Sequence, residues 1–127
     1  MSNITVGTTA SASTTVTEQN TALAVKSGNL EVFATPMMVA LMEEAACNCL
    51  SEYLLEGSSS VGTSVEIAHT SPSPLGIEVT ATAKIESVDG RKVEFSVTAR
   101  DENGDIGSGK HTRIIVEKER FMQKLSK

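Results

Sequence analysis

The chain has 127 residues, a formal net charge of -5, 3% aromatic residues and no tryptophan. Proteins that bind nucleic acids usually carry a basic patch, and those that stack bases need aromatic side chains, so both roles are disfavoured. The length suits one compact domain with a modest core. We therefore interpret residues 1–127 as a single domain, in which 1–15 form either a frayed lead-in or a first strand.

The sequence also argues against export and membrane insertion. The N-terminus, MSNITVGTTASASTTVT, lacks the basic start and apolar run of a secretory signal. No stretch approaches the roughly 20 apolar residues of a membrane span. Cys47 and Cys49 would point in different directions on a helix and cannot pair with each other. We expect a cytoplasmic protein without disulfides, and with two histidines in all we expect no metal site and no cofactor.

The first predicted elements are a strand and a helix. The segment TTVTEQNTALAV (14–25) combines β-branched residues with a polar break and predicts a strand or a hairpin-like pair. A helix is expected from Pro36 to about Glu56. Thr35 is a good N-cap and proline suits the first helical position. Gly57 and the three serines after it would end this helix.

The rest of the sequence predicts β-structure. Strands are expected over 61–70, 76–88, 92–100 and 106–119, with a short terminal helix over 120–125. Asp89-Gly90 and Asn103-Gly104 are hairpin turn signals. Two of the strands alternate cleanly, and their apolar faces hold Ile77, Val79, Ala81, Ala83, Ile85, Val93, Phe95, Val97 and Ala99. One long helix followed by antiparallel strands favours an α+β domain, in which a curved sheet wraps around the helix. This arrangement is the hotdog fold.

Two adjacent glutamates, Glu43 and Glu44, interrupt the apolar segment ATPMMVALMEEAACNCL (34–50). On a helical wheel the following residues fall around the first glutamate: Val39, Ala40, Ala46, Cys47, Leu50 and Leu54. The second lies about 100° further round on a more polar side and is interpreted as a solvated charge. An ionised carboxylate among apolar groups is costly unless it is paired. Glu43 is therefore either a structural hydrogen-bond anchor or a general base in a half-buried cleft.

The two histidines receive different interpretations. Counted in steps of two, His69 shares a strand face with Ile67 and Val65, and we expect this face to point toward the helix. There it is either a core residue or a catalytic partner of Glu43. His111 lies between basic residues in GKHTRIIV and is interpreted as a solvated strand residue.

Thr35 has a structural explanation as a helix cap. It also precedes Glu43 by eight residues, about 12 Å along one helix. The two side chains cannot bond each other directly within one chain. A substrate, a water, His69 or a second subunit must lie between them if they act together.

The segments ATPMMVALMEEAA (34–46) and VGTSVEIAHTSPSPLG (61–76) resemble the fluoroacetyl-CoA thioesterase-like branch of the hotdog-fold thioesterases. That family has Thr-Pro at the helix start, a glutamate eight residues on and a histidine a further 26 on. These positions match Thr35, Glu43 and His69 without a gap. The resemblance extends over most of the chain from about Val16, and it selects Glu43 rather than Glu44.

The resemblance implies hydrolysis of an acyl-CoA thioester by a homodimer with active sites at the subunit interface. It makes Thr35 the nucleophile or the hydroxyl that orients the thioester, and Glu43 the base or a covalent participant. His69 would activate water and protonate the thiolate. Gly62 and Gly76 match glycines that line the ligand site, and a backbone N–H near Gly62 would bind the thioester oxygen.

The acyl group and the reaction type are less closely specified. Fluoroacetate-specific members close the pocket with phenylalanines before the helix, whereas AVKSGNLEVF (24–33) contains only Phe33. We therefore expect another short- or medium-chain acyl group. A non-catalytic module that binds acyl-CoA and a hotdog dehydratase or hydratase stay as alternatives, although the Thr-Glu-His spacing favours the thioesterase. Candidates for contacts with CoA phosphates, each also interpretable as a surface charge, are Lys84, Arg91, Lys92, Lys110 and Arg113.

Overall fold

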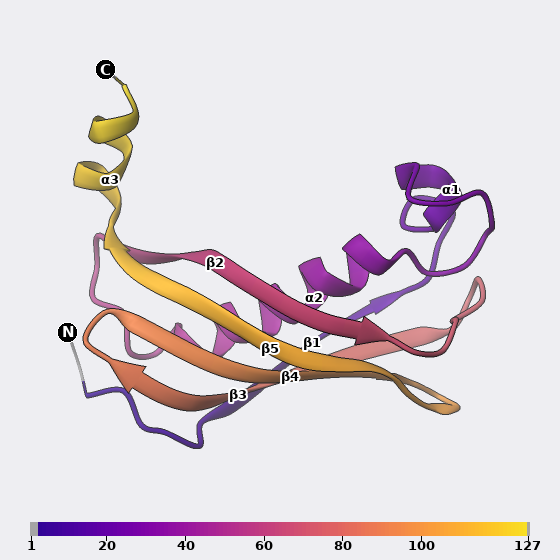
Figure 1. Ribbon diagram of the computed structural model, residues 1–127, viewed down its shortest axis with the longest axis horizontal. Helices are drawn as coiled ribbons and strands as arrows, with labels where there is room; N and C mark the ends of the chain where they lie inside the picture. Colours follow the sequence, from indigo (N-terminus) through magenta and orange to yellow (C-terminus); the bar gives the residue numbers. More distant parts are fainter. Residues whose placement is uncertain (1–2, 127) are drawn as a thin grey trace.

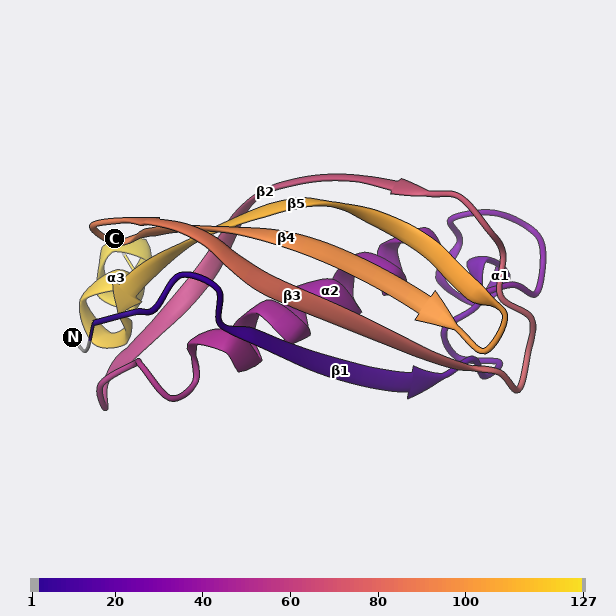
Figure 2. The ribbon, with the colours of Figure 1, turned by 90° about the horizontal axis from the view of Figure 1, so that it is seen from below.

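The computed structural model describes residues 3–126. Its elements are β1 (Thr9–Thr15), α1 (Ala22–Val25), α2 (Thr35–Leu50), β2 (Ser58–His69), β3 (Glu78–Asp89), β4 (Lys92–Asp101), β5 (Gly104–Glu117) and α3 (Lys118–Leu125) (Figure 1). The five strands pair antiparallel in the order β1-β3-β4-β5-β2. The sheet curves over α2, as Figure 2 shows from the side. The predicted α+β hotdog arrangement is therefore confirmed.

The core lies between the sheet and α2 because each contributes an apolar face. In β3 and β4 the inward residues are at most 1% exposed: Val79, Ala81, Ala83, Ile85, Val93, Phe95, Val97 and Ala99. The buried stripe of α2 consists of Met38, Leu41, Met42, Ala45, Ala46, Cys49 and Leu50. The predicted apolar faces of these two strands are confirmed, with Ile77 partly buried just before β3.

The strand predicted over 14–25 is wrong. The first strand lies earlier, at β1, so the second half of the segment 1–15 forms a first strand, and the chain then turns and forms α1. The Asn20 side chain accepts a hydrogen bond from the Thr17 N–H at 2.9 Å. The Thr21 hydroxyl accepts one from the Ala24 N–H at 3.2 Å and so caps α1. Short polar side chains that bond the nearby backbone compete with strand pairing, which explains the difference.

Helix α2 is shorter than the sequence predicts. It ends at Leu50 rather than near Glu56. The N–H and the hydroxyl of Ser51 both donate to the Asn48 carbonyl, at 3.4 and 2.9 Å, which closes a tighter turn than an α-helix. Gly57, at a φ of 88°, then reverses the chain, and β2 begins directly after it. The serines that were expected to end the helix are therefore part of a strand.

The position of α2 leaves one side of the sheet uncovered. The helix packs mainly against β1 and β3. The other edge is β2, which pairs only with β5 among residues 3–126 and has no fully buried residue in this single chain. An open flank therefore runs along α2 beneath β5 and β2.

The chain ends in α3, which projects from the end of β5 (Figure 1). It confirms the short terminal helix expected over 120–125 and begins two residues earlier, at Lys118. Among residues 3–126, no helix is long and apolar enough to cross a membrane.

Candidate active site

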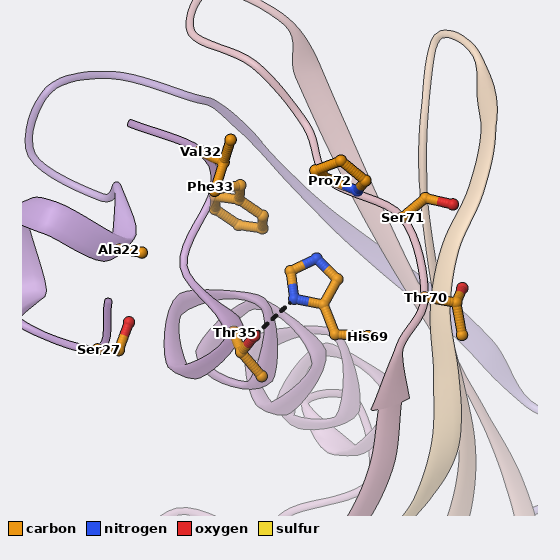
Figure 3. A pocket seen from close by; sticks show the side chains of 9 residues that line it. All are labelled: Ala22, Ser27, Val32, Phe33, Thr35, His69, Thr70, Ser71 and Pro72. Carbon is orange, nitrogen blue, oxygen red and sulfur yellow. Dashed lines mark hydrogen bonds between the residues drawn. The ribbon is translucent and has the colours of Figure 1, made fainter. Parts of the chain in front are cut away.

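The first predicted pair of site residues meets where α2 begins and β2 ends. Thr35 is the first residue of α2, and the N-cap is Ala34, which makes no side-chain cap bond. The Thr35 hydroxyl lies 2.7 Å from Nδ1 of His69, a hydrogen-bond distance (Figure 3). The predicted capping role of Thr35 is therefore wrong. Its hydroxyl faces an imidazole instead of the helix backbone.

His69 is half-buried, and its surroundings favour the neutral ring. Burial lowers the pKa of this imidazole below its usual value of 6.5, while the nearby backbone of Ser71 opposes part of that effect. Nε2 is buried and forms no hydrogen bond with any residue in 3–126. A neutral imidazole with a hydroxyl at one nitrogen and no partner at the other can relay a proton between the hydroxyl and a ligand. The expectation that His69 faces inward is confirmed, because its ring reaches the start of α2.

A cavity of about 280 Å³ adjoins this pair, between the segment that precedes α2 and the loop that follows β2. Figure 3 shows the residues that line it: Ala22, Ser27, Val32, Phe33, Thr35, His69, Thr70, Ser71 and Pro72. Hydrogen bonds join the two walls. The Phe33 N–H donates to the Ser73 carbonyl at 2.9 Å. The buried Ser73 hydroxyl donates to Oδ2 of Asp101 at 2.7 Å. These bonds connect the segment before α2 with the loop after β2, and that loop with the end of β4.

Glu43 occupies a separate position, halfway along α2 beside the open flank. Its side chain is 37% exposed, and Oε2 accepts a hydrogen bond from Nη1 of Arg113 at 3.0 Å. Nε2 of His111 lies 3.7 Å from the same oxygen. No other residue in 3–126 donates a hydrogen bond to this carboxylate. Glu43 is thus an ion-paired carboxylate with one oxygen held and the other, Oε1, available to a ligand.

The helical wheel distinguished the two glutamates correctly but misplaced the first. Glu44 is exposed, as predicted. Glu43 borders the buried stripe rather than standing in its middle, since Cys47 is exposed and Val39 only half-buried. The stripe is centred one residue earlier along the helix, on Met42, because α2 packs under β1 and β3.

The sequence interpretation missed two residues of this site, His111 and Arg113. They are 2% and 6% exposed, so the interpretation of His111 as solvated is wrong, and so is that of Arg113 as a surface charge. The alternation of β5 places both on the inward face with Ile115. Counting back by twos from that isoleucine would have identified them. Their polarity concealed the pattern. The Glu43 carboxylate makes the burial of these polar side chains tolerable.

The two glycines have different surroundings. A Cβ at Gly62 would overlap Oε2 of Glu43, so glycine lets this carboxylate lie against the backbone of β2. The register of β2 shifts between Gly62 and Ser64, which marks a β-bulge at this point. Gly76 lies in a turn at a φ of 89°, and its N–H donates to the Val16 carbonyl at 2.8 Å. That N–H is therefore already occupied.

The structure gathers the predicted residues into two groups within one protomer. Thr35 bonds His69, while Glu43 lies against Gly62 and bonds Arg113. The expected contact between His69 and Glu43 is not made within the chain. Because the eight residues from Thr35 to Glu43 span about 12 Å of helix, a ligand or a second subunit is needed to connect the groups.

A curved five-stranded sheet around one helix, with polar groups along that helix, is the architecture of the hotdog thioesterases. Comparison with known proteins defines the family within this class. The family model described as FlK, fluoroacetyl-CoA-specific thioesterase, matches residues 16–119. The chain belongs to this family, and it is accordingly an enzyme of the thioesterase class.

Individual relatives agree with that assignment. The fluoroacetyl-CoA thioesterase of Streptantibioticus cattleyicolor is 43% identical over 95 residues, which are 75% of this chain and 68% of the relative. A solved structure of a mutant of the fluoroacetyl-CoA-specific thioesterase FlK has a TM-score of 0.92 at 34% identity, covering 99% of this chain and 98% of that one. A Thermus thermophilus thioesterase superfamily member has a TM-score of 0.89 at 31% identity, covering 99% and 96%. Further FlK structures contain fluoroacetate and CoA, or acetyl-CoA.

Proposed function

We propose that the protein hydrolyses a short- or medium-chain acyl-CoA thioester to the free acid and CoA, with Thr35, Glu43 and His69 at a homodimer interface. The observation that carries this proposal is the 2.7 Å hydrogen bond between the Thr35 hydroxyl and His69 Nδ1 at the edge of a cavity. A threonine released from capping and a neutral imidazole form a proton-transfer pair where a ligand can enter. Relatives of the family have been crystallised with CoA and with acetyl-CoA.

The hydrogen bonds suggest how His69 handles protons. When the Thr35 hydroxyl donates to Nδ1, the neutral ring carries its own proton on Nε2, the nitrogen that has no partner in residues 3–126. The ring can then accept a proton at Nδ1 from the attacking hydroxyl or water and donate one from Nε2 to the departing thiolate. The net reaction adds water across the C–S bond and gives a carboxylic acid and a thiol.

Glu43 supplies the second function, that of base or covalent participant. Arg113 holds Oε2, and Oε1 has no hydrogen-bond partner among residues 3–126. From that position the carboxylate can take a proton from water. Alternatively it can attack the thioester carbon to form an anhydride and release the thiolate, and water then hydrolyses the anhydride.

Negative charge that develops on the thioester oxygen also needs donors. The positive end of the α2 dipole lies at Thr35, beside the cavity. Gly62 remains our proposed backbone donor where the thioester reaches Glu43, because a ligand can approach a glycine backbone closely. Gly76 would contribute by shaping the turn behind the ligand site, since its N–H already bonds Val16.

Two features support a homodimer and a small acyl group. A second copy placed along the exposed edge strand β2 would cover the open flank and bring further groups to Glu43. The cavity of about 280 Å³ lies just below the roughly 300–1,000 Å³ typical of sites for drug-sized ligands. Phe33 is the one phenylalanine among the residues that line it, so the cavity has room for acyl groups other than fluoroacetyl.

A panel of acyl-CoA substrates from acetyl to decanoyl, with release of free thiol as the readout, tests this function. We expect turnover of at least one short member. His69→Ala should lower kcat by about 100-fold or more, the range of a lost general acid–base group. Ser71→Ala, in the same cavity wall, is the matched control and should retain most activity. Binding without turnover across the whole panel would favour the acyl-CoA-binding module, and hydration of an enoyl-CoA would favour the hydratase.

A further inference from the structure

The environment of His111 determines which of its ring nitrogens carries the proton. The ring lies on the inner face of β5, is 1% exposed and stacks on Phe95 with 5.9 Å between the centroids. Nδ1 lies 2.8 Å from the Ser64 carbonyl, which can only accept, so Nδ1 donates. In the neutral ring Nε2 then has a lone pair, and it faces Nη1 of Arg113 at 3.1 Å. Nε2 is therefore an acceptor for the guanidinium group.

Arg113 is held on three sides. Its Nε and Nη2 donate to the hydroxyl and the carbonyl of Ser60, at 2.8 and 3.1 Å. Its Nη1 donates to Oε2 of Glu43 at 3.0 Å and to His111. Each guanidinium nitrogen thus has a defined partner on β2, β5 or α2.

The contact between Arg113 and Glu43 uses one nitrogen and one oxygen, although arginine and carboxylate groups commonly pair through two parallel hydrogen bonds. The two-bond arrangement would occupy both carboxylate oxygens. Ser60 accepts from Nε and from one of the two N–H groups of Nη2, and His111 accepts from Nη1 beside Glu43. These partners fix the guanidinium in the orientation that leaves Oε1 of Glu43 unbonded.

We propose that His111 is a positioning residue of this site: it accepts a hydrogen bond from Arg113 and thereby holds the guanidinium so that one oxygen of Glu43 stays open to the substrate. This role rests on the thioesterase function proposed above. His111 acts through Arg113 and contacts no reacting atom.

The electrostatics of the pocket agree with a neutral acceptor. Burial lowers the pKa of His111 and the positive charge of Arg113 lowers it further, against opposing effects of the Ser64 carbonyl and of Glu43. The ionised groups that face the ring are Arg113 on its own strand and Glu43 on α2, while β4 presents Phe95. An imidazolium would have no lone pair for Arg113 and would attract Glu43 to itself.

Two substitutions distinguish the role of His111 as a hydrogen-bond acceptor from its packing against Phe95. His111→Phe keeps a ring against Phe95 but has no acceptor, and His111→Gln offers an amide oxygen near the position of Nε2. We expect kcat of the phenylalanine variant to fall about 10- to 100-fold, the effect of one charge-assisted hydrogen bond, with KM changed less than about twofold. The glutamine variant should regain a substantial part of kcat. A folded His111→Phe variant with wild-type kcat would overturn the proposal, as would equal losses in the two variants.

A nitrogen-15 NMR measurement on the wild-type protein decides the same point without turnover. The chain has two histidines, so a His69→Gln variant assigns the remaining ring. At neutral pH we expect His111 to be neutral with the proton on Nδ1. A proton on Nε2, or a charged ring, would refute the role even if His111→Phe does not fold. Failure of the thioesterase function would appear separately, as absence of turnover in the unmodified protein.

Discussion

Thr35 and His69 come into contact because the start of α2 lies beside the end of β2. Helix α2 begins at Thr35, and β2 ends at His69. One residue earlier, the threonine would sit at the N-cap position, where its hydroxyl would bond the helix backbone. At the first helical position the hydroxyl is free to bond Nδ1 of His69. The hydrogen bond between this threonine and His69 therefore depends on a shift of a single residue in the helix boundary.

The two neighbouring glutamates provide a direct test at the residue scale. We expect Glu43→Gln to lower kcat by about 100-fold or more, because the amide is neither a base nor a nucleophile. Glu44→Gln removes the same charge from an exposed position one residue away and should leave turnover nearly unchanged. Thiol release from the best acyl-CoA substrate measures both variants. Comparable losses would show that the exposed carboxylate also takes part.

A label from solvent tests whether Glu43 is the attacking group. If Glu43 attacks the thioester and water then attacks the Glu43 carbon of the anhydride, repeated turnovers in oxygen-18 water place the label in the Glu43 carboxylate. If water attacks the thioester directly, or attacks the acyl carbon of the anhydride, the label enters only the released acid. A label in the peptide that contains Glu43, detected by mass spectrometry, therefore establishes covalent participation. The Glu43→Gln variant is the control for non-enzymatic exchange.

The lowered pKa values of the two histidines predict the direction in which the free energy of unfolding changes with pH. Burial lowers the pKa of both His69 and His111 below the ordinary 6.5. As the pH falls through 6.5, the unfolded chain therefore binds protons before the folded protein does. The free energy of unfolding should be constant above this pH and fall below it, toward the folded-state pKa values.

Urea unfolding between about pH 8 and pH 5.5 measures this dependence, since carboxylates titrate mainly at lower pH. The double variant His69→Gln, His111→Gln should show a flatter profile over the same range. A free energy of unfolding that stays level, or rises, as the wild-type protein is acidified would contradict neutral histidines in the fold.

Individual site residues were predictable where a periodicity or a family spacing applied. The wheel separated Glu43 from Glu44, and the strand count directed His69 toward the helix. His111 and Arg113 were missed because polar residues in a strand were assumed to be solvated. Their burial depends on an ion pair with Glu43 from a distant helix, 70 positions away in the sequence. Such a partner cannot be inferred from local polarity.

At the scale of elements, the bulge in β2 begins at Gly62, where the strand lies directly against the Glu43 carboxylate. Gly62→Ala would place a methyl group against the carboxylate, with His111 and Arg113 3.1 and 3.3 Å from the new carbon. We expect the variant to lose most of its activity and to unfold at lower temperature, because the ion pair must move. The adjacent exposed Thr63→Ala is the control. Thermal unfolding and kcat measured together would show whether the space at Gly62 is needed.

The elements themselves were predicted best where one face is buried over a long run. Strand β4 alternates throughout and β3 alternates from Val79 to Ile85, before a register shift near Ser87, and the two strands bracket the turn at Gly90. The prediction for 14–25 was wrong because its β-branched residues suggested a strand. In the structure the side chains of Asn20 and Thr21 bond the local backbone and start α1. The predicted end of α2 was wrong because apolar residues continue past Leu50 in the sequence. They pack against the core from a turn rather than from the helix.

At the scale of the whole molecule, a single chain keeps the two groups of proposed site residues apart and leaves one edge of the sheet unpaired among residues 3–126. Thr35 and Glu43 lie on one helix about 12 Å apart, with an open flank beside the second. The strand next to that flank, β2, is twelve residues long and its outer edge pairs with no residue in 3–126. Exposed edges of this length are usually covered in native proteins. A second copy of the chain would both pair the edge and enclose the site.

The unpaired edge of β2 predicts that the active form is a dimer or larger and that β2 lies at the interface. Val65, on β2, is 37% exposed in the single chain, and Val65→Asp would place an unpaired charge against the partner. We expect this variant to sediment as a folded monomer with little activity. Val6→Asp, at a 56% exposed valine outside the sheet, adds the same charge and should remain an active dimer. A wild-type monomer with full activity in sedimentation and dilution assays would show that one chain forms a complete site.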